Sequence, residues 1–288
     1  MAESLVVKIL RQAMREKYAV PAFNVYNIET INAVTQAAEE LESPLILALS
    51  PATVRHIGMR LVATLVRDIS WRSTVPVALH LDHGHNPEFI RQCIQAGFDS
   101  VMIDESTEDI ATNIRNTREI VNQARGRGNV AVEAELGCVG GFNVATNTLI
   151  SDDWLTDPDA VADFVNKTGI DCLAVAIGTQ HGPYRTTPKL DIERLRKIRQ
   201  QVRIPLVLHG ASGLLDRQIK EVIEAGISKI NIATELKTAF TDAVRKYLMV
   251  HTSESDMRWY LQAGQKAVNE VAKQKIKLFG SAGKSRSV

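Results

Sequence analysis

Short apolar runs rich in β-branched residues alternate along this chain with longer segments of helical periodicity. This alternation predicts consecutive βα units whose strands lie parallel in one sheet. Most of the runs are strongly apolar in the middle, as expected of strands that are buried on both faces. The expected strands are residues 19–25, 44–50, 76–83, 100–104, 129–137, 172–178, 205–210 and 229–234.

The number of βα units favours a closed barrel over an open doubly wound sheet, which usually has fewer strands. An open sheet also carries a glycine-rich turn after its first strand, and no such turn follows Asn24. We therefore expect an α/β protein, a single (β/α)8 TIM barrel of residues 1–288 with extra terminal helices. Helical periodicity between the strands is clear at 27–41, 87–96, 109–124 and 190–201.

Segments at both ends lie outside the repeating units. The first 15 residues mix charged side chains into their apolar positions, which predicts an amphipathic helix and not a signal peptide. Residues 256–278 predict a last helix that caps the barrel or reaches a neighbouring subunit. The small and basic segment 280–288 is expected to be a mobile tail.

Composition excludes several classes of protein. With 45% hydrophobic and 23% charged residues the chain is globular, and no stretch approaches the roughly 20 apolar residues of a membrane-spanning helix. A net charge of +1 gives no sign of nucleic-acid or membrane binding. The cysteines are too few for a disulfide framework and predict reduced thiols in a cytoplasmic protein. They are Cys93, Cys138 and Cys172.

Polar residues close the expected strands. In barrels of this type the active site lies at the carboxyl ends of the strands, so these residues are candidates for it. A single polar residue at such a place is as often a turn former, but chance explains poorly why every strand has one. The candidates are Asn24, Ser50, Asp82, His83, Asp104, Glu135, His181, His209 and Asn231.

Three of these strand-end residues are histidines. His83, His181 and His209 follow the third, sixth and seventh strands. Three imidazoles that leave one coordination position open are a common catalytic zinc site. The sequence therefore predicts that these three residues bind zinc.

The other histidines are better explained without a metal. His56 and His251 have no acidic strand-end neighbour and are expected at the surface. His80 lies inside the third strand and is expected to be a packed interior residue. His85 follows a glycine, and the next two residues, Asn and Pro, are typical of a helix start that carries the chain away.

Three carboxylates lie near these histidines. Asp104 and Glu135 end the intervening strands, where they could orient the histidines or bind a second divalent or monovalent cation. Asp82 precedes a proposed ligand, so strand alternation points its side chain away from that ligand's metal. It is therefore the candidate general acid and base.

Small residues and hydroxyls follow the last two strands, where barrels commonly bind phosphate. Residues 209–213 (HGASG) and 231–234 (NIAT) expose backbone N–H groups beside hydroxyl donors. Gly182 could add one more amide. A Gly-Ala-Ser-Gly turn alone usually marks only a helix start, but its place beside a metal-binding histidine favours a phosphate site.

Over nearly its whole length the chain resembles the class II ketose-bisphosphate aldolases, and within them the tagatose-bisphosphate aldolases most closely. The matching segments are YAVPAFN at 18–24, HLDH at 80–83, VMID at 101–104, VEAELG at 132–137, AVAIGT at 174–179 with His181 and Gly182, LHGASG at 208–213 and KINIATEL at 229–236.

The resemblance implies zinc on the three histidines, Asp82 as proton donor, and Asp104 and Glu135 as secondary metal ligands or partners of the ligands. Zinc polarises a carbonyl and stabilises the enediolate of aldol cleavage, so no Schiff base is needed. Asn231 would hydrogen-bond that enediolate. The resemblance also implies that the ketose phosphate is held by Gly182, Gly210, Ala211, Ser212, Asn231, Ile232, Ala233 and Thr234.

The expected reaction is reversible cleavage of D-tagatose 1,6-bisphosphate to dihydroxyacetone phosphate and glyceraldehyde 3-phosphate. Fructose 1,6-bisphosphate or another ketose phosphate is the alternative substrate. A non-catalytic sugar-phosphate-binding partner subunit and a zinc hydrolase are the other classes considered. The intact proton donor argues against the first, and the phosphate loops argue against the second.

Assembly into a homodimer or homotetramer is expected on general grounds and on the resemblance. Arg258, near the start of the last helix, matches a position where the resemblance suggests contact with the distal phosphate, across a subunit interface.

One segment departs from the family. Members usually carry acidic residues after the Gly-Gly that follows the fifth strand, and one of them moves in to exchange a proton on dihydroxyacetone phosphate. Here residues 142–146 read FNVAT, and no acid follows until Asp152 and Asp153.

If one of these aspartates replaces the missing acid, alanine at Asp152 or at Asp153 should lower cleavage sharply in one case. Steady-state assays of the two single variants check this. Normal activity in both would dispose of the loop-aspartate hypothesis.

Overall fold

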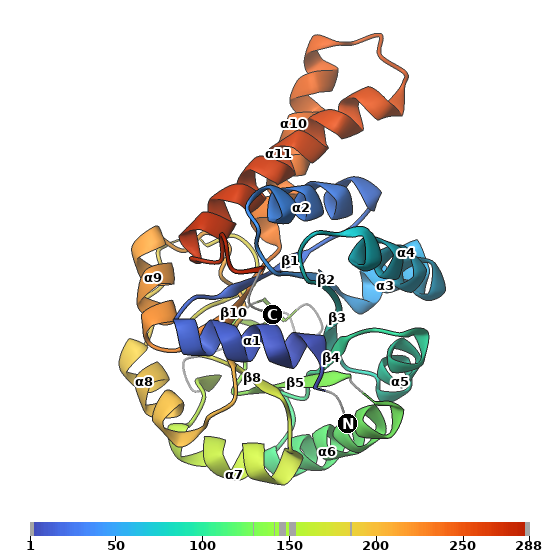
Figure 1. Cartoon of the computed structure of the whole chain (residues 1–288). Helices are drawn as coiled ribbons and strands as arrows, with labels where there is room; N and C mark the ends of the chain where they lie inside the picture. Colours follow the sequence, from blue (N-terminus) through green and yellow to red (C-terminus); the bar gives the residue numbers. More distant parts are fainter. Residues whose placement is uncertain are drawn as a thin grey trace.

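A computed structural model describes residues 3–128, 130–140, 142–143, 148–149, 154–184 and 186–285. Eight parallel strands close into a barrel, and the first strand pairs with the last (Figure 1), which confirms the predicted TIM barrel. Around the barrel the strands are β1 (Val20–Asn24), β2 (Leu45–Leu49), β3 (Val77–Gly84), β4 (Ser100–Ile103), β5 (Ala131–Leu136), β8 (Cys172–Val175), β9 (Leu206–Leu208) and β10 (Ile227–Ile232).

Helices surround the barrel, and polar caps set where several of them begin. Asn27 accepts a hydrogen bond from the Thr30 N–H in a capping box, and Asn86 caps the helix that Pro87 starts, as predicted. The helices are α1 (Leu5–Glu16), α2 (Ile28–Glu40), α3 (Pro51–Ile57), α4 (Met59–Arg72), α5 (Pro87–Ala96), α6 (Ile110–Arg127), α7 (Pro158–Thr168), α8 (Ile192–Gln201), α9 (Asp216–Glu224), α10 (Thr234–Val250) and α11 (Met257–Leu278); β6 (Phe142–Asn143) and β7 (Thr148–Leu149) form a separate pair.

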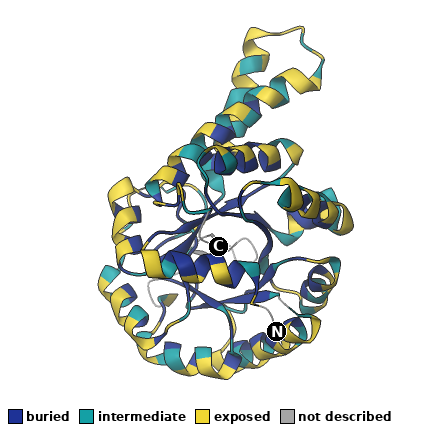
Figure 2. Cartoon of the chain, in the orientation of Figure 1, coloured by how far each residue is buried: buried dark blue, intermediate teal, exposed yellow. Residues whose placement is uncertain are grey.

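Apolar side chains fill two layers, which leaves one end of the barrel for polar chemistry. Side chains that point outward from the strands pack beneath the helices, whose outer faces stay exposed (Figure 2). Inside the barrel, small residues such as Ala22 and Ala78 pack against Ile9 and Leu10 of α1. Helix α1 thus closes the amino-terminal end of the barrel with apolar contacts.

Helices α10 and α11 form a hairpin that projects beyond the barrel (Figure 1). The predicted last helix, 256–278, is thereby found at Met257–Leu278, and it packs along α2. Asn269 donates to the Ala33 carbonyl at 3.0 Å, and Lys273 pairs with Glu40 at 2.6 Å. Among the described helices, none has the length and apolar character needed to cross a membrane.

The chain beyond α11 was expected to be mobile, but its described part, residues 280–285, is held in place. Ser281 is buried and its hydroxyl lies 2.9 Å from the Ser43 hydroxyl. The Gly283 N–H donates to the Leu41 carbonyl at 2.8 Å. Backbone pairing, which composition does not reveal, therefore fixes these residues, and 286–288 lie outside the described part.

The hairpin depends on the absence of a side chain at Gly264. A Cβ there would lie 2.6 Å from the Phe240 ring. We expect Gly264→Ala to lower the free energy of unfolding by about 1–3 kcal/mol because the ring must move. Gly126→Ala is the matched control, since its Cβ would meet nothing within 4 Å. Urea denaturation measures both, and equal stability of the two variants would contradict the packing argument.

Candidate active site

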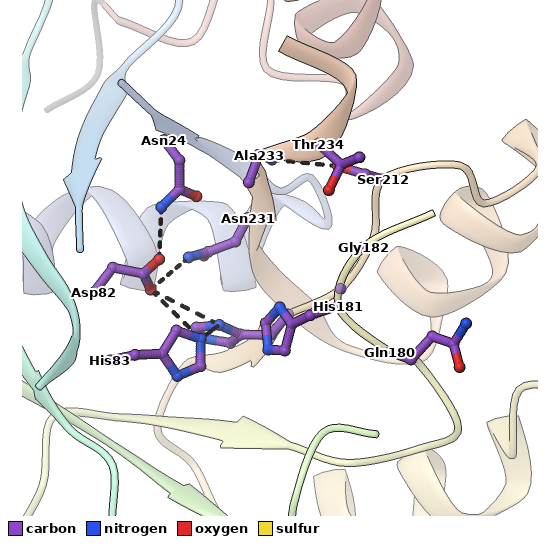
Figure 3. Close-up of a pocket in the computed structure, with 12 residues that line it drawn as sticks. Asn24, Asp82, His83, Gln180, His181, Gly182, Ser212, Asn231, Ala233 and Thr234 are labelled. Carbon is purple, nitrogen blue, oxygen red and sulfur yellow. Dashed lines mark hydrogen bonds and ion pairs between the residues drawn. The ribbon is translucent and has the colours of Figure 1, made fainter. Parts of the chain in front are cut away.

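A pocket opens at the carboxyl ends of the barrel strands, where the sequence places most of its candidates (Figure 3). The residues that line it come from the ends of β1, β3 and β10 and from the loops after β8 and β9. They are Asn24, Asp82, His83, Gln180, His181, Gly182, His209, Gly210, Ser212, Asn231, Ala233 and Thr234. Gln180 had no sequence signal beyond its place beside His181.

The three predicted histidines meet in this pocket. His83, His181 and His209 each offer a ring nitrogen, and these atoms lie within 4.8 Å of one another. His83 Nε2 and His209 Nδ1 are 3.0 Å apart, close to the separation of about 3.3 Å between two nitrogens on a tetrahedral zinc. The donor set therefore fits a divalent metal with one position left open.

A carboxylate orients each of two histidine rings. His83 Nδ1 lies 2.6 Å from Asp104 Oδ2, and His209 Nε2 lies 2.8 Å from Glu133 Oε1. These contacts leave His83 Nε2 and His209 Nδ1 facing the pocket. Such partners fix the tautomer and raise the basicity of metal-binding imidazoles.

Strand alternation wrongly separated Asp82 from His83, because His83 departs from the alternation that Ala78, His80 and Asp82 follow. Alternation would place Asp82 and His83 on opposite faces, but His83 adopts a left-handed φ of 51° and the β3–β4 register shifts between Leu81 and Gly84. Both side chains consequently face the pocket. Asp82 Oδ1 lies 4.0 Å from His83 Nε2 and 3.8 Å from His209 Nδ1.

Two asparagines hold the Asp82 carboxylate. Asn24 Nδ2 donates to Oδ2 at 2.6 Å, and Asn231 Nδ2 donates to Oδ1 at 3.0 Å (Figure 3). Burial opposes ionisation of Asp82, but the positive charge of His83 and His209 outweighs it and holds the pKa below its usual range. Asp82 is therefore held as an anion beside His83 and His209.

Asp104 and Glu135 lie behind His83, where they form a second group of oxygen and nitrogen atoms within 4.8 Å of one another. Glu135 Oε1 accepts the Val139 N–H at 2.8 Å, while its buried Oε2 has no hydrogen-bond partner in the part of the chain that the structure describes. Burial raises the pKa of Glu135 to about 8, with a further contribution from Asp104. This group could hold a second cation or take up a proton.

The floor of the pocket contains an ionic cluster that sequence reasoning missed. Lys229 Nζ donates to Glu133 Oε2 at 2.7 Å and lies 3.4 Å from His80 Nε2. His80 is buried and also contacts the Ser100 hydroxyl, as expected for a packed interior residue. The alternation of Glu133 with Glu135 in β5 was a signal that both side chains point into the barrel.

The opposite side of the pocket suits a phosphate group. Thr234 begins α10, whose amino terminus carries a partial positive charge, and Gly182 lies across from it. Ser212 Oγ accepts the Ala233 N–H at 3.2 Å, so the loops after β9 and β10 are joined at this point.

Tyr184 ties together the two loops that carry His181 and His209. Its hydroxyl donates to the Gly210 carbonyl at 2.7 Å and accepts the Gln180 N–H at 3.0 Å. The loops approach so closely that a Cβ at Gly210 would lie 2.5 Å from the Gln180 carbonyl oxygen. Gly210 also has a φ of 67°, so both sterics and backbone conformation require glycine.

Three predicted substrate-binding residues do not line the pocket. The Ser50 hydroxyl accepts the Thr53 N–H at the start of α3. Ala211 and Ile232 belong to the core between barrel and helices, so only their backbone could reach a ligand. Asp152 and Asp153, which the sequence offers as replacements for the missing loop acid, lie outside the described residues.

The chain is similar in sequence and structure to known aldolases. Residues 5–284 match the family model described as class II fructose-bisphosphate aldolase. The structure of the YdjI aldolase from Escherichia coli K12 is 39% identical with a TM-score of 0.86, and the match covers 98% of each chain. A candidate fructose-1,6-bisphosphate aldolase from Coccidioides immitis is 31% identical over 99% of each chain, with a TM-score of 0.87. Fructose-bisphosphate aldolase from Campylobacter jejuni is 26% identical over 96% of this chain and 94% of that one, with a TM-score of 0.83.

Removing the Tyr184 hydroxyl should loosen the two loops. We expect Tyr184→Phe to raise KM for a sugar phosphate about 3- to 10-fold, because loss of the two hydrogen bonds that position the loops should weaken binding by about 1 kcal/mol. Tyr247→Phe in α10 is the matched control, since Tyr247 stacks on His251 and does not line the pocket. An unchanged KM in the Tyr184 variant would show that the hydroxyl does not position the loops.

Proposed function

Since the chain belongs to the class II fructose-bisphosphate aldolase family and is a carbon–carbon lyase, we propose that it uses zinc to cleave D-tagatose 1,6-bisphosphate reversibly. The products are dihydroxyacetone phosphate and glyceraldehyde 3-phosphate. The observation that carries the proposal is the meeting of three histidine nitrogens beside the Asp82 carboxylate.

The proposed metal ligands are His83, His181 and His209. When bound, zinc supplies a Lewis acid that polarises the ketose carbonyl and offsets the negative charge that develops during cleavage. The residues fit this role because Asp104 and Glu133 leave one nitrogen of His83 and one of His209 free toward the pocket. Glu135 and Asp104 are proposed to accept a second cation.

Asp82 is proposed to move the proton of the C4 hydroxyl. Cleavage requires a base at that hydroxyl, and condensation requires the same group to return the proton to the aldehyde. Asn24 and Asn231 hold one carboxylate oxygen each, so the carboxylate cannot turn away from the substrate. Asn231 also reaches the region where charge develops, and its amide can donate there.

One substrate phosphate is proposed to bind between Gly182 and the start of α10. Gly210, Ser212 and Thr234 line this part of the pocket, and the helix amino terminus favours an anion. Binding of the phosphate there would orient the ketose with its carbonyl toward the histidines and its C4 hydroxyl toward Asp82.

Tagatose and fructose 1,6-bisphosphates differ in configuration at one hydroxyl carbon, and fructose 1,6-bisphosphate is the alternative substrate. The names of the similar aldolases include fructose-1,6-bisphosphate as a substrate, which supports a ketose bisphosphate in general. A coupled assay that follows dihydroxyacetone phosphate by NADH oxidation decides between the two. Stoichiometric zinc without cleavage of any ketose phosphate would defeat the proposal.

Removal of the Asp82 carboxylate tests the proton transfer. Asp82→Asn should lower kcat about 10²- to 10⁴-fold because no base remains at the C4 hydroxyl, while zinc content stays unchanged. Asp163→Asn, at an exposed ion pair on α7, is the control and should retain full activity. A kcat within twofold of the unmodified enzyme would exclude Asp82 as the proton carrier.

Zinc binding should release a proton. Burial lowers the pKa of His83, but Asp82 and Asp104 outweigh it and raise the pKa to about 10, so the metal-free residue is protonated at pH 7. A ligand must be neutral, and the apparent zinc affinity should therefore rise about tenfold per pH unit between pH 6 and 8.

Calorimetry in buffers of different ionisation enthalpy counts the protons released. Asp104→Asn should lower the pKa of His83 and reduce the count at pH 8, since the carboxylate that raises the pKa is gone. Zinc binding without proton release at pH 7 would contradict the assignment of His83.

We propose a homodimer or homotetramer as the working assembly. Large apolar side chains are exposed around the outer end of the α10–α11 hairpin, including Met249, Val250, Met257 and Trp259. Arg258 pairs with Asp256 and does not line the pocket of its own chain. Contact of Arg258 with a distal phosphate would therefore come from a neighbouring subunit.

A further inference from the structure

A second hollow lies at the amino-terminal end of the barrel. It is lined by the end of α1, the end of α8 and the turn from α9 into β10. The start of β10 marks this end, whereas the candidate active site lies at the carboxyl ends of the strands. An adjoining depression shares Met14 and Arg199 with it and extends to Arg203. We call the two together the Arg199 hollow.

Arg199 is a partly buried cation whose contacts are all with neutral groups. Its Nη1 donates to Met14 Sδ at 3.5 Å, and its Nη2 donates to the Val202 carbonyl. Burial lowers the pKa of the guanidinium, and no carboxylate of the described chain lies close enough to oppose this. A guanidinium has five N–H donors, so several remain available beside the hollow.

The turn before β10 leaves room for the Arg199 side chain because it has a glycine at the point of contact. Gly226, in the turn before β10, has a φ of 118°, and a Cβ there would lie 2.5 Å from Arg199 Cδ. The arginine stem thus crosses the turn at the one place without a side chain. Together with the Val202 contact, this fixes the guanidinium at the edge of the hollow.

The other polar groups of the hollow also suit an anion. Lys17, in a left-handed conformation at the end of α1, and Arg203 line it with Arg199, against a single carboxylate, Glu224. Ser228 lines it as well; this residue is fully buried, and its hydroxyl has no hydrogen-bond partner among the described residues. A buried hydroxyl without a partner and a partly buried cation without an acidic partner both cost free energy that a ligand could recover.

We propose that the Arg199 hollow binds a small oxyanion, the phosphoryl or carboxylate group of a metabolite. The planar guanidinium takes such a group in a two-point contact, Lys17 adds a second cation and the Ser228 hydroxyl can donate. The site is separate from the catalytic pocket, because the apolar packing of α1 inside the barrel lies between the two ends.

Equilibrium dialysis of the full chain against labelled inorganic phosphate tests the proposal, with a parallel arm in malonate to distinguish a phosphoryl from a carboxylate ligand. We expect Arg199→Gln to lose one bound anion per chain, or to weaken its binding at least tenfold. Arg199→Lys should bind more weakly than the unmodified chain, since the charge remains but the two-point contact is lost. Circular dichroism verifies that both variants are folded.

Arg196→Gln is the matched control, because Arg196 lies on the same helix but pairs with Glu193 at 3.2 Å. This variant should keep every bound anion. Ser212→Ala should weaken only a phosphate in the catalytic pocket, so the two sites can be counted separately. Selenate soaked into crystals should give an anomalous peak beside the Arg199 guanidinium. Equal anion binding by the unmodified chain and Arg199→Gln in both arms, or an equal loss in Arg196→Gln, would overturn the proposal.

Discussion

Hydrogen-bonded closure of β1 against β10 is the constraint on which the site depends. The register pairs Ala22 with Asn231, so the end of the first strand lies beside the end of the last. Asn24 and Asn231 can therefore both donate hydrogen bonds to Asp82, which lies on β3. An open sheet with the same strands would leave these two asparagines at opposite edges. Closure also directs every strand end toward one axis, where three histidines can share a metal.

Charge compensation inside the barrel sets the orientation of side chains in the candidate active site. Glu133 joins Lys229 to His209, and the same carboxylate therefore neutralises a buried cation and fixes an imidazole. Loss of either partner would leave an unpaired charge in a dry interior, which is far costlier than loss of a surface pair. The Arg199 hollow differs at the other end of the barrel, because there the cation has no acidic partner among the described residues and space remains beside it.

Much of the architecture could be predicted because it depends on local patterns. Alternating apolar and helical segments gave the eight strands, and strand-end polar residues gave His83, His181, His209, Asp82 and Asn231, which the structure brings together. That Asp82 and His83 face the same pocket could not be predicted, since the direction of His83 depends on its left-handed backbone and on a register shift against β4. Glu133 and Tyr184 were missed for a related reason: each acts through contacts with residues far away in the sequence.

The sequence by itself determined the barrel, the donor set and the family, because periodicity, strand-end chemistry and motifs are all properties of neighbouring residues. Only the tertiary structure decided which ring nitrogen each histidine presents, since Asp104 and Glu133 reach the rings from other strands. It also decided that residues 280–285 pack against the loop after α2, and that Arg199 has no carboxylate partner within the described residues. These features depend on distances between segments that are remote along the chain, and such distances exist only once the barrel has closed.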